Sequence, residues 1–361
     1  MKNYKRLGDY IREVNVRNRE LEVTKLVGLT IDKAFIPSVA NVIGTDLSNY
    51  KVIRKEQFAC SLMQVSRDGK MPVAMFEEDE AIMSPAYPMF EVIDKEILLP
   101  QYLMMWFSRS EFDREASYYA VGGVRGSLTW EDFCNMQLPI PSITRQREIV
   151  AEYETLTRRI RINEQMIQNL ESTAQTLYRK MFVDGIDKEN LPEGWRMGTL
   201  GEIATFKYGK LAQKHPKSSK FPYPVFSGYA ITGYTDEYTL KERTIVIIAR
   251  GDAGTGKICM APQKCFLSNL AIAIETKDMA IKDYLYYHLL DSDTMSLRSG
   301  SAQAQITINN IEPFEITIPS NEICIVFSQC VESLYNDILL RTEENLKLNE
   351  LQSLLLAKMG Q

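Results

Sequence analysis

The strongest hydrophobic pattern in the chain lies in residues 144–182. From Ile149, alternate steps of four and three residues meet an apolar or aromatic side chain at nine of ten positions. These positions are Ile149, Tyr153, Leu156, Ile160, Asn163, Ile167, Leu170, Ala174, Leu177 and Met181. Neither Pro nor Gly interrupts the segment, so the pattern predicts one helix of roughly 55 Å with a single apolar seam. A buried helix of an ordinary domain is the alternative to a rod that needs a partner helix.

A second segment, residues 321–360, repeats the first at a constant offset of 178. The seam maps onto Phe327, Val331, Leu334, Ile338, Arg341, Asn345, Leu348, Gln352, Leu355 and Met359. When the two helices are laid antiparallel about their centres, Asn163 lies opposite Asn345. A polar pair at one seam position costs stability but fixes register. We therefore predict an intramolecular antiparallel coiled coil whose register this pair sets.

Two mixed α/β segments alternate with the helices and run through the same order of elements. Each has strand-like runs, a turn with basic residues, a helix-like segment (residues 100–118 in the first) and a small-residue loop. The fold class is α+β, a tandem duplication with pseudo-twofold symmetry. The predicted parts are a first domain (1–141), a first helix (142–182), a linker (183–195), a second domain (196–320) and a second helix (321–361). Such a chain suits an elongated ligand with two recognition points, and duplex DNA repeats every 34–36 Å or so.

The composition of the chain bears on its cellular location and on whether it binds a metal. The chain has 361 residues and a net charge of −5, and its longest apolar runs, such as 244–249, are too short to cross a membrane. No signal peptide is evident. The six cysteines show no CxxC spacing and there are only two histidines, which argues against a zinc site. We expect reduced cysteines and a cytoplasmic protein.

Because no segment is basic overall, a DNA-binding face must come from local clusters. Between Glu202 and Asp236 there are five lysines and no acid. In this cluster, the candidate DNA contacts are Lys207, Tyr208, Lys210, Lys214 and Lys217. Two predicted turns add further candidates: Arg67, Asp68 and Lys70 in a tight turn at 66–70, and Arg250 and Lys257 at a second turn. The small-residue loops add Arg125, Gln303 and Gln305. Such side chains reach phosphates and base edges. Solvated turn charges are the alternative for each.

The enzyme signals are weaker. Residues 251–257 fit G-x-x-x-x-G-K, but Ile258 stands where a phosphate-binding loop needs Ser or Thr, and a strand rather than a helix follows. A strand–turn–strand hairpin fits better. Ser84-Pro85-Ala86-Tyr87 faintly resembles an amino-methyltransferase motif, with Ala86 departing from it. We predict a non-catalytic chain; a nucleotide-binding enzyme is the less favoured alternative.

Short motifs in a fixed order carry a family resemblance over nearly the whole chain. They are Gln64–Gly69, Ser84–Pro88, Gly122–Phe133, Leu138–Ser142, Leu191–Trp195, Gly233–Asp236 and Ile248–Arg250. Together with the duplicated helices, they resemble the specificity (S) subunit of type I restriction-modification systems. The acidic net charge is a departure from what a DNA-binding chain would favour.

The resemblance implies two target-recognition domains, each reading one half of a split site in double-stranded DNA. It implies that the helices set the spacer and dock two methyltransferase subunits, which two restriction subunits can join. S-adenosylmethionine would bind to the methyltransferase and ATP with Mg to the restriction subunit, with no cofactor on this chain. A coiled-coil scaffold without sequence readout is the main alternative.

Overall fold

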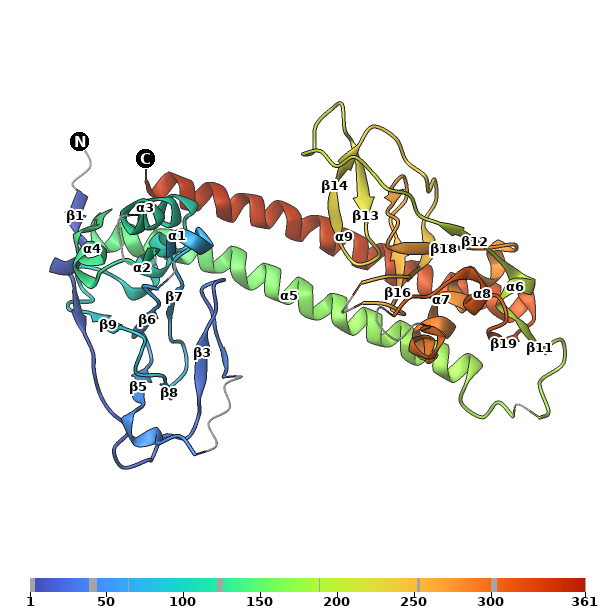
Figure 1. Cartoon of the computed structure of the whole chain (residues 1–361), viewed down its shortest axis with the longest axis horizontal. Helices are drawn as coiled ribbons and strands as arrows, with labels where there is room; N and C mark the ends of the chain where they lie inside the picture. Colours follow the sequence, from blue (N-terminus) through green and yellow to red (C-terminus); the bar gives the residue numbers. More distant parts are fainter. Residues whose placement is uncertain are drawn as a thin grey trace. The chain divides into compact units, whose positions relative to one another are not determined.

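The computed structural model describes residues 4–38, 44–63, 65–121, 126–187, 189–251, 254–299 and 304–360. The chain divides into two compact units (Figure 1). Unit 1 comprises Met1–Asn163 and Thr342–Gln361, and unit 2 comprises Glu164–Arg341. Each unit therefore holds one of the two predicted domains, with a half of each long helix.

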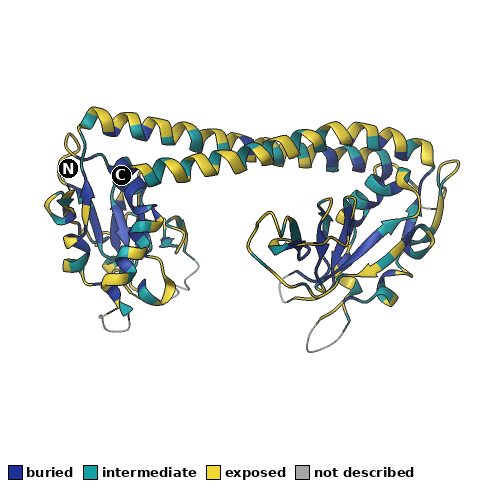
Figure 2. Cartoon of the chain, turned by 90° about the horizontal axis from the view of Figure 1, so that it is seen from above, coloured by how far each residue is buried: buried dark blue, intermediate teal, exposed yellow. Residues whose placement is uncertain are grey.

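The two long helices are α5 (Ile143–Phe182) and α9 (Asn321–Met359). Every predicted seam position is buried or half-buried, whereas most flanking charged side chains are exposed (Figure 2). In unit 1, Asn163 Nδ2 donates to Asn345 Oδ1 at 2.9 Å, and Gln352 Nε2 donates to Thr157 Oγ1 at 2.7 Å. Residue numbers rise along one helix as they fall along the other, so the pair is antiparallel, with the two asparagines opposite each other.

The first domain is built on a four-stranded antiparallel sheet with the order β2-β9-β6-β7. Alternate residues of β6 point to opposite faces: Phe58 and Cys60 join the core under the helices, and Ala59 joins a second core. The strands of the domain are β1 (Tyr4–Arg6), β2 (Ile11–Glu13), β3 (Val27–Leu29), β4 (Phe35–Pro37), β5 (Lys51–Arg54), β6 (Phe58–Cys60), β7 (Val73–Met75), β8 (Glu80–Met83), β9 (Met89–Val92) and β10 (Gln137–Pro139). The central sheet thus separates a helical layer from a layer of short strand pairs.

Four α-helices cover this domain: α1 (Val65–Asp68), α2 (Pro100–Phe107), α3 (Ser110–Ala120) and α4 (Trp130–Asn135). Two expectations are wrong here. The helix expected over 100–118 breaks at Ser108–Arg109 into α2 and α3, and the tight hairpin turn expected at 66–70 is the one-turn helix α1. Directly after α1, Gly69 adopts a φ of +65° and its N–H donates to the Val65 carbonyl, so the glycine ends a helical turn instead of joining two strands directly.

The second domain repeats this plan with the sheet order β12-β18-β15-β16. In β15, Ile245 and Ile247 face the helical layer while Val246 faces the opposite core. The elements are β11 (Arg196–Thr199), α6 (Leu200–Ile203), β12 (Ala204–Tyr208), β13 (Tyr223–Phe226), β14 (Ile231–Thr235), β15 (Thr244–Ile248), β16 (Ile258–Ala261), β17 (Phe266–Leu267), β18 (Ala271–Thr276), α7 (Lys282–Asp291), α8 (Ile308–Ile311) and β19 (Glu315–Ile318). The first domain also has the short 3-10 helices η1 (Leu7–Asp9) and η2 (Leu47–Asn49), and the second domain has η4 (Met279–Ile281) and η5 (Thr294–Leu297).

Equivalent pairings occur in both domains, which establishes the tandem duplication. A terminal antiparallel pair, β1–β10 or β11–β19, leads into α5 or α9 respectively. The central sheets match strand for strand, and each is backed by a long helix: Val150 of α5 lies in the core of unit 1 and Phe327 of α9 in that of unit 2. The α+β class and the helix that follows each domain are as predicted.

Among the described helices, α9 alone is long and apolar enough, by length and composition, to cross a membrane. The lengths of the uninterrupted apolar runs in the sequence do not distinguish this helix. The same helix places Cys324, Phe327 and Val331 in the core of unit 2 and Met359 in that of unit 1. Its apolar content is therefore explained in part by packing, and its length is only weak evidence for a membrane span.

Candidate nucleic-acid interface

In unit 1, the residues of the basic turn predicted to contact DNA lie on α1 and just after it: Arg67 and Asp68 are in α1, Lys70 follows it, and all three are exposed. Arg67 Nε lies 2.7 Å from Asp68 Oδ1, and Lys70 Nζ lies 3.2 Å from Asp32 Oδ1. The hydrogen bonds from Arg67 hold the pKa of Asp68 below its usual range. Both cations therefore have surface carboxylate partners, which a phosphate or a base edge would have to displace or share.

The small-residue loop of unit 1 returns to this same place. Arg125 lies outside the described residues, but Gly126 follows it directly and packs on α1. A Cβ atom at Gly126 would collide with Ser66 Oγ, and the φ of +70° also favours glycine there. The structure therefore brings the end of the predicted arginine loop beside the helix that holds Arg67.

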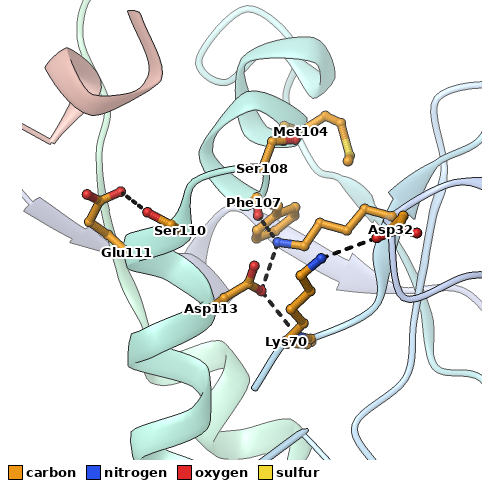
Figure 3. Close-up of polar contacts among 10 residues, drawn as sticks. Asp32, Lys70, Met104, Phe107, Ser108, Ser110, Glu111 and Asp113 are labelled. Atoms are coloured by element: carbon orange, nitrogen blue, oxygen red, sulfur yellow. Dashed lines mark hydrogen bonds and ion pairs between the residues drawn. The ribbon is translucent and has the colours of Figure 1, made fainter. Parts of the chain in front are cut away.

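A buried ion pair, which the sequence did not reveal, joins the β3–β4 hairpin to the helices. Lys33 Nζ lies 2.9 Å from Asp113 Oδ1 of α3 and also donates to the Phe107 carbonyl. Asp113 Oδ1 accepts a further hydrogen bond of 3.1 Å from the Met71 N–H. Figure 3 shows Asp113, Phe107 and Lys70 gathered around this contact. Burial lowers the pKa of Lys33, although Asp113 acts in the opposite sense. The pair holds the hairpin, α3 and the chain after α1 in one arrangement.

In unit 2, two members of the predicted lysine cluster are engaged within the domain. Lys207 Nζ on β12 lies 2.6 Å from Glu275 Oε2 on the neighbouring strand β18. The Tyr208 hydroxyl accepts a 3.1 Å hydrogen bond from the Ile308 N–H at the start of α8. These contacts give both residues a structural role in addition to any contact with a ligand.

The other lysines lie on an exposed loop, residues 209–222, which we call the lysine loop. Lys210, Lys214 and Lys217 are exposed and form no ion pair among the described residues. His215 stacks on Phe221 with ring centroids 3.9 Å apart, and Lys217 Nζ lies 5.7 Å from the Tyr234 ring centroid. Aromatic packing therefore orders the loop while its charges remain available to an anionic partner.

The glycine-rich segment 251–257 forms the connection of an antiparallel hairpin, as predicted. Strands β15 and β16 pair on either side of it, and Ile258 begins β16 where a phosphate-binding loop needs a helix. Arg250 and Lys257 are both exposed at its ends. Arg298, which the sequence did not single out, donates from Nε to the Thr255 carbonyl at 2.9 Å. The connection is thus held from outside by the segment that follows η5.

The last two candidates belong to the loop after η5. Gln303 lies outside the described residues. Gln305 is exposed, and its backbone pairs with Ser299 in an isolated antiparallel bridge. Since Ser299 follows Arg298 directly, Gln305 lies on the segment that also holds the Gly251–Lys257 connection.

Residues 192–350 match the model of the type I restriction modification DNA specificity domain. The second domain is thus similar to a DNA specificity domain. The matched range includes the lysine loop, the Arg250–Lys257 hairpin and most of α9. No curated protein matches the sequence.

Solved structures of type I restriction-modification proteins are also similar to this chain. The S subunit of the type I restriction-modification system from M. genitalium is 17% identical with a TM-score of 0.59, over 100% of this chain and 96% of that one. A chain from a structure on assembly and conformational transition of the type I R-M system is 20% identical with a TM-score of 0.47, over 99% and 97%. The HsdS subunit from Thermoanaerobacter tengcongensis is 20% identical with a TM-score of 0.37, over 99% and 96%. The similarity to the M. genitalium S subunit, which covers the whole chain, shows that this chain shares its fold.

Substitutions in one unit should affect one half of a DNA target. If the predicted contacts are correct, Arg67→Ala and Arg125→Ala should each weaken binding to the first half-site about 5- to 100-fold, and Arg250→Ala should do so only at the second, because each would remove a base or phosphate contact. Competition binding with duplexes altered in one half at a time measures this. Equal effects on both halves would contradict independent reading by the two domains.

Proposed function

We propose that this chain is the non-catalytic specificity subunit of a type I restriction-modification complex. It reads a bipartite sequence in double-stranded DNA and directs methyltransferase subunits to it. The observation that carries the proposal is a duplicated domain, whose second copy matches the DNA specificity domain, in a chain that shares the fold of an S subunit. We assign target recognition to residues 1–141 and 196–320, each reading one half-site.

The contacts of the long helices support a spacer role. Asn163 is fully buried, and its amide donates to both Glu344 Oε2, at 2.8 Å, and Asn345 Oδ1. A slip of the helices by one turn would leave this amide without these acceptors inside an apolar seam, which is costly. We propose that this register fixes the number of base pairs between the two half-sites.

The partners and cofactors in this proposal are those that the resemblance to S subunits implies. Two methyltransferase subunits bind the chain and bring S-adenosylmethionine, and two restriction subunits that use ATP and Mg can join them. The chain itself binds none of these cofactors, and the complex acts in the cytoplasm. The exposed lysines of the lysine loop in unit 2 supply local positive charge to a chain whose net charge is −5.

Mapping of methylated adenines across the genome tests this function. Cells carry the partner methyltransferase either with or without this chain. We expect a split motif with a fixed gap to be methylated only when the chain is present. A matched control carries the chain with Arg250→Ala, which should relax or remove only one half of the motif.

An active methyltransferase whose methylation pattern does not change with the chain would overturn the proposal. That result would favour the scaffold function, in which the paired helices serve interaction alone. A split motif that keeps its sequence but changes its gap upon a one-turn insertion in both α5 and α9 would add direct support for the spacer role.

A further inference from the structure

The most exposed large apolar side chain in the described structure lies among the free lysines of unit 2. Leu211 is 84% exposed, ahead of Tyr118 at 77% and Val121 at 74%. It stands between Lys210 and Lys214 on the lysine loop, where neither lysine has a carboxylate partner among the described residues. Contact with a ligand would explain why a leucine occupies this place.

The loop is anchored at both ends, so the exposure of Leu211 is built into its backbone. On one side, the Gly209 N–H donates to the Ala271 carbonyl at 3.0 Å and the Lys210 N–H to Leu267 at 2.9 Å. On the other side, His215 and Tyr234 exchange two backbone hydrogen bonds of 2.9 Å. Leu211 therefore lies a single residue from a fixed strand edge, and it does not join the core that β17 and β18 contribute to.

We propose that Leu211 is a wedge that contacts the bases of bound DNA and partly unstacks one base step of the second half-site. This inference rests on the proposed function. Lys210, Lys214, Lys217 and Lys220 engage the phosphates on either side and hold the leucine at the level of the bases. Apolar side chains inserted between base steps are a common device of proteins that deform DNA.

DNA suits this loop better than a lipid surface does. A single leucine adds little apolar area to a membrane interface, where stable binding needs a larger buried face or a second anchor. The loop also belongs to the segment matched by the DNA specificity family, as does the basic Arg250–Lys257 hairpin. Unit 1 offers a parallel, since Tyr118 and Val121 lie just before the loop that ends at Gly126 beside Arg67.

The test uses the complete methyltransferase complex and a target duplex with 2-aminopurine at successive positions of the second half-site. Binding by the parent complex should raise 2-aminopurine fluorescence at one step. Leu211→Ser should abolish that rise and weaken binding about tenfold at every salt concentration, because the apolar contact of the leucine with the bases is lost. The slope of log affinity against log salt should stay unchanged, because no phosphate contact is lost.

Two matched variants separate the wedge from the charges. Leu211→Met should keep both the fluorescence rise and the affinity. Lys214→Ala should keep the rise but make the salt slope shallower by about one, as expected for one lost phosphate contact. Because Leu211 is so exposed, thermal unfolding of all three variants should match that of the parent.

The outcomes are distinguishable. Parent-like affinity and fluorescence in Leu211→Ser would overturn the wedge while leaving the specificity function intact. A second result would also overturn the wedge: Leu211→Ser weakens binding to vesicles of anionic phospholipid but leaves DNA binding unchanged. That result would assign the loop to a lipid surface. Failure of the parent complex to select any DNA sequence would instead remove the proposed function itself.

Discussion

Replacing Asp113 by alanine should lower the free energy of local opening in unit 1 by about 3–5 kcal/mol, because it leaves the Lys33 ammonium buried without its counter-charge. The side chains of Lys33 and Asp113 are 9% and 14% exposed, so water cannot readily replace the lost partner. The Met71 N–H also loses its acceptor. Hydrogen exchange of peptides that cover the β3–β4 hairpin and α3 measures the opening free energy in the full chain.

A surface pair beside the buried one provides the control. Asp32→Ala removes the partner of Lys70, but their side chains are 77% and 50% exposed, so the cost should not exceed about 1 kcal/mol. The double change Lys33→Met with Asp113→Leu should recover most of the stability, since an apolar pair replaces the buried charges. An equal loss for Asp113→Ala and Asp32→Ala would show that burial does not determine the strength of this contact.

The long helices were predictable because their signal is periodic and repeated. A spacing of 3.5 residues identifies one face of a helix wherever it packs. The offset of 178 between the two repeats predicts that Asn163 lies opposite Asn345 in an antiparallel pair, and the structure shows this contact. The hairpin around 251–257 was also predictable. Its flanking runs are too apolar for surface loops, and Ile258 is incompatible with a phosphate-binding loop.

Local signals failed where tertiary contacts decide the structure. Asp68-Gly69 is a common hairpin-turn pair, but here the segment packs on α3 and Gly69 ends a helical turn. The predicted helix 100–118 breaks where Arg109 turns away, donating to the Leu356 carbonyl and stacking on Trp106 with 4.1 Å between guanidinium and ring centroid. Leu356 lies in helix α9, far from Arg109 along the chain, so the sequence around Arg109 does not predict this contact.

The candidate site shows the same division. The lysine loop could be found because a run of lysines without acids is visible in sequence, but the engagement of Lys207 by Glu275 depends on strand pairing. The Lys33–Asp113 pair and the Arg298–Thr255 contact also join residues that are far apart in the chain. Sequence reasoning thus located charged segments, whereas the fold determines which of their charges are free.

Phe327→Ala should destabilise unit 2 by about 3–5 kcal/mol, the usual cost of removing a fully buried aromatic ring. Phe327 is 0% exposed in the core between α9, α5 and α7. Its ring lies 5.2 Å from that of Phe182 and 5.5 Å from that of Tyr287, both at near-perpendicular angles. The substitution would leave a cavity that α5, α7 and α9 cannot all close, because other buried side chains already fix their positions.

Hydrogen exchange should locate this loss in residues 174–182 and 284–289, with protection around Asn163 and Asn345 in unit 1 retained. Leu340→Ala, on the same helix but 65% exposed, is the matched control and should change stability by less than about 0.5 kcal/mol. If the two units behave as separate cooperative bodies, methylation mapping with Phe327→Ala should lose the second half-site before the first. Equal loss of protection in both units would instead mean that α5 and α9 transmit the damage along their length and that the chain unfolds as one body.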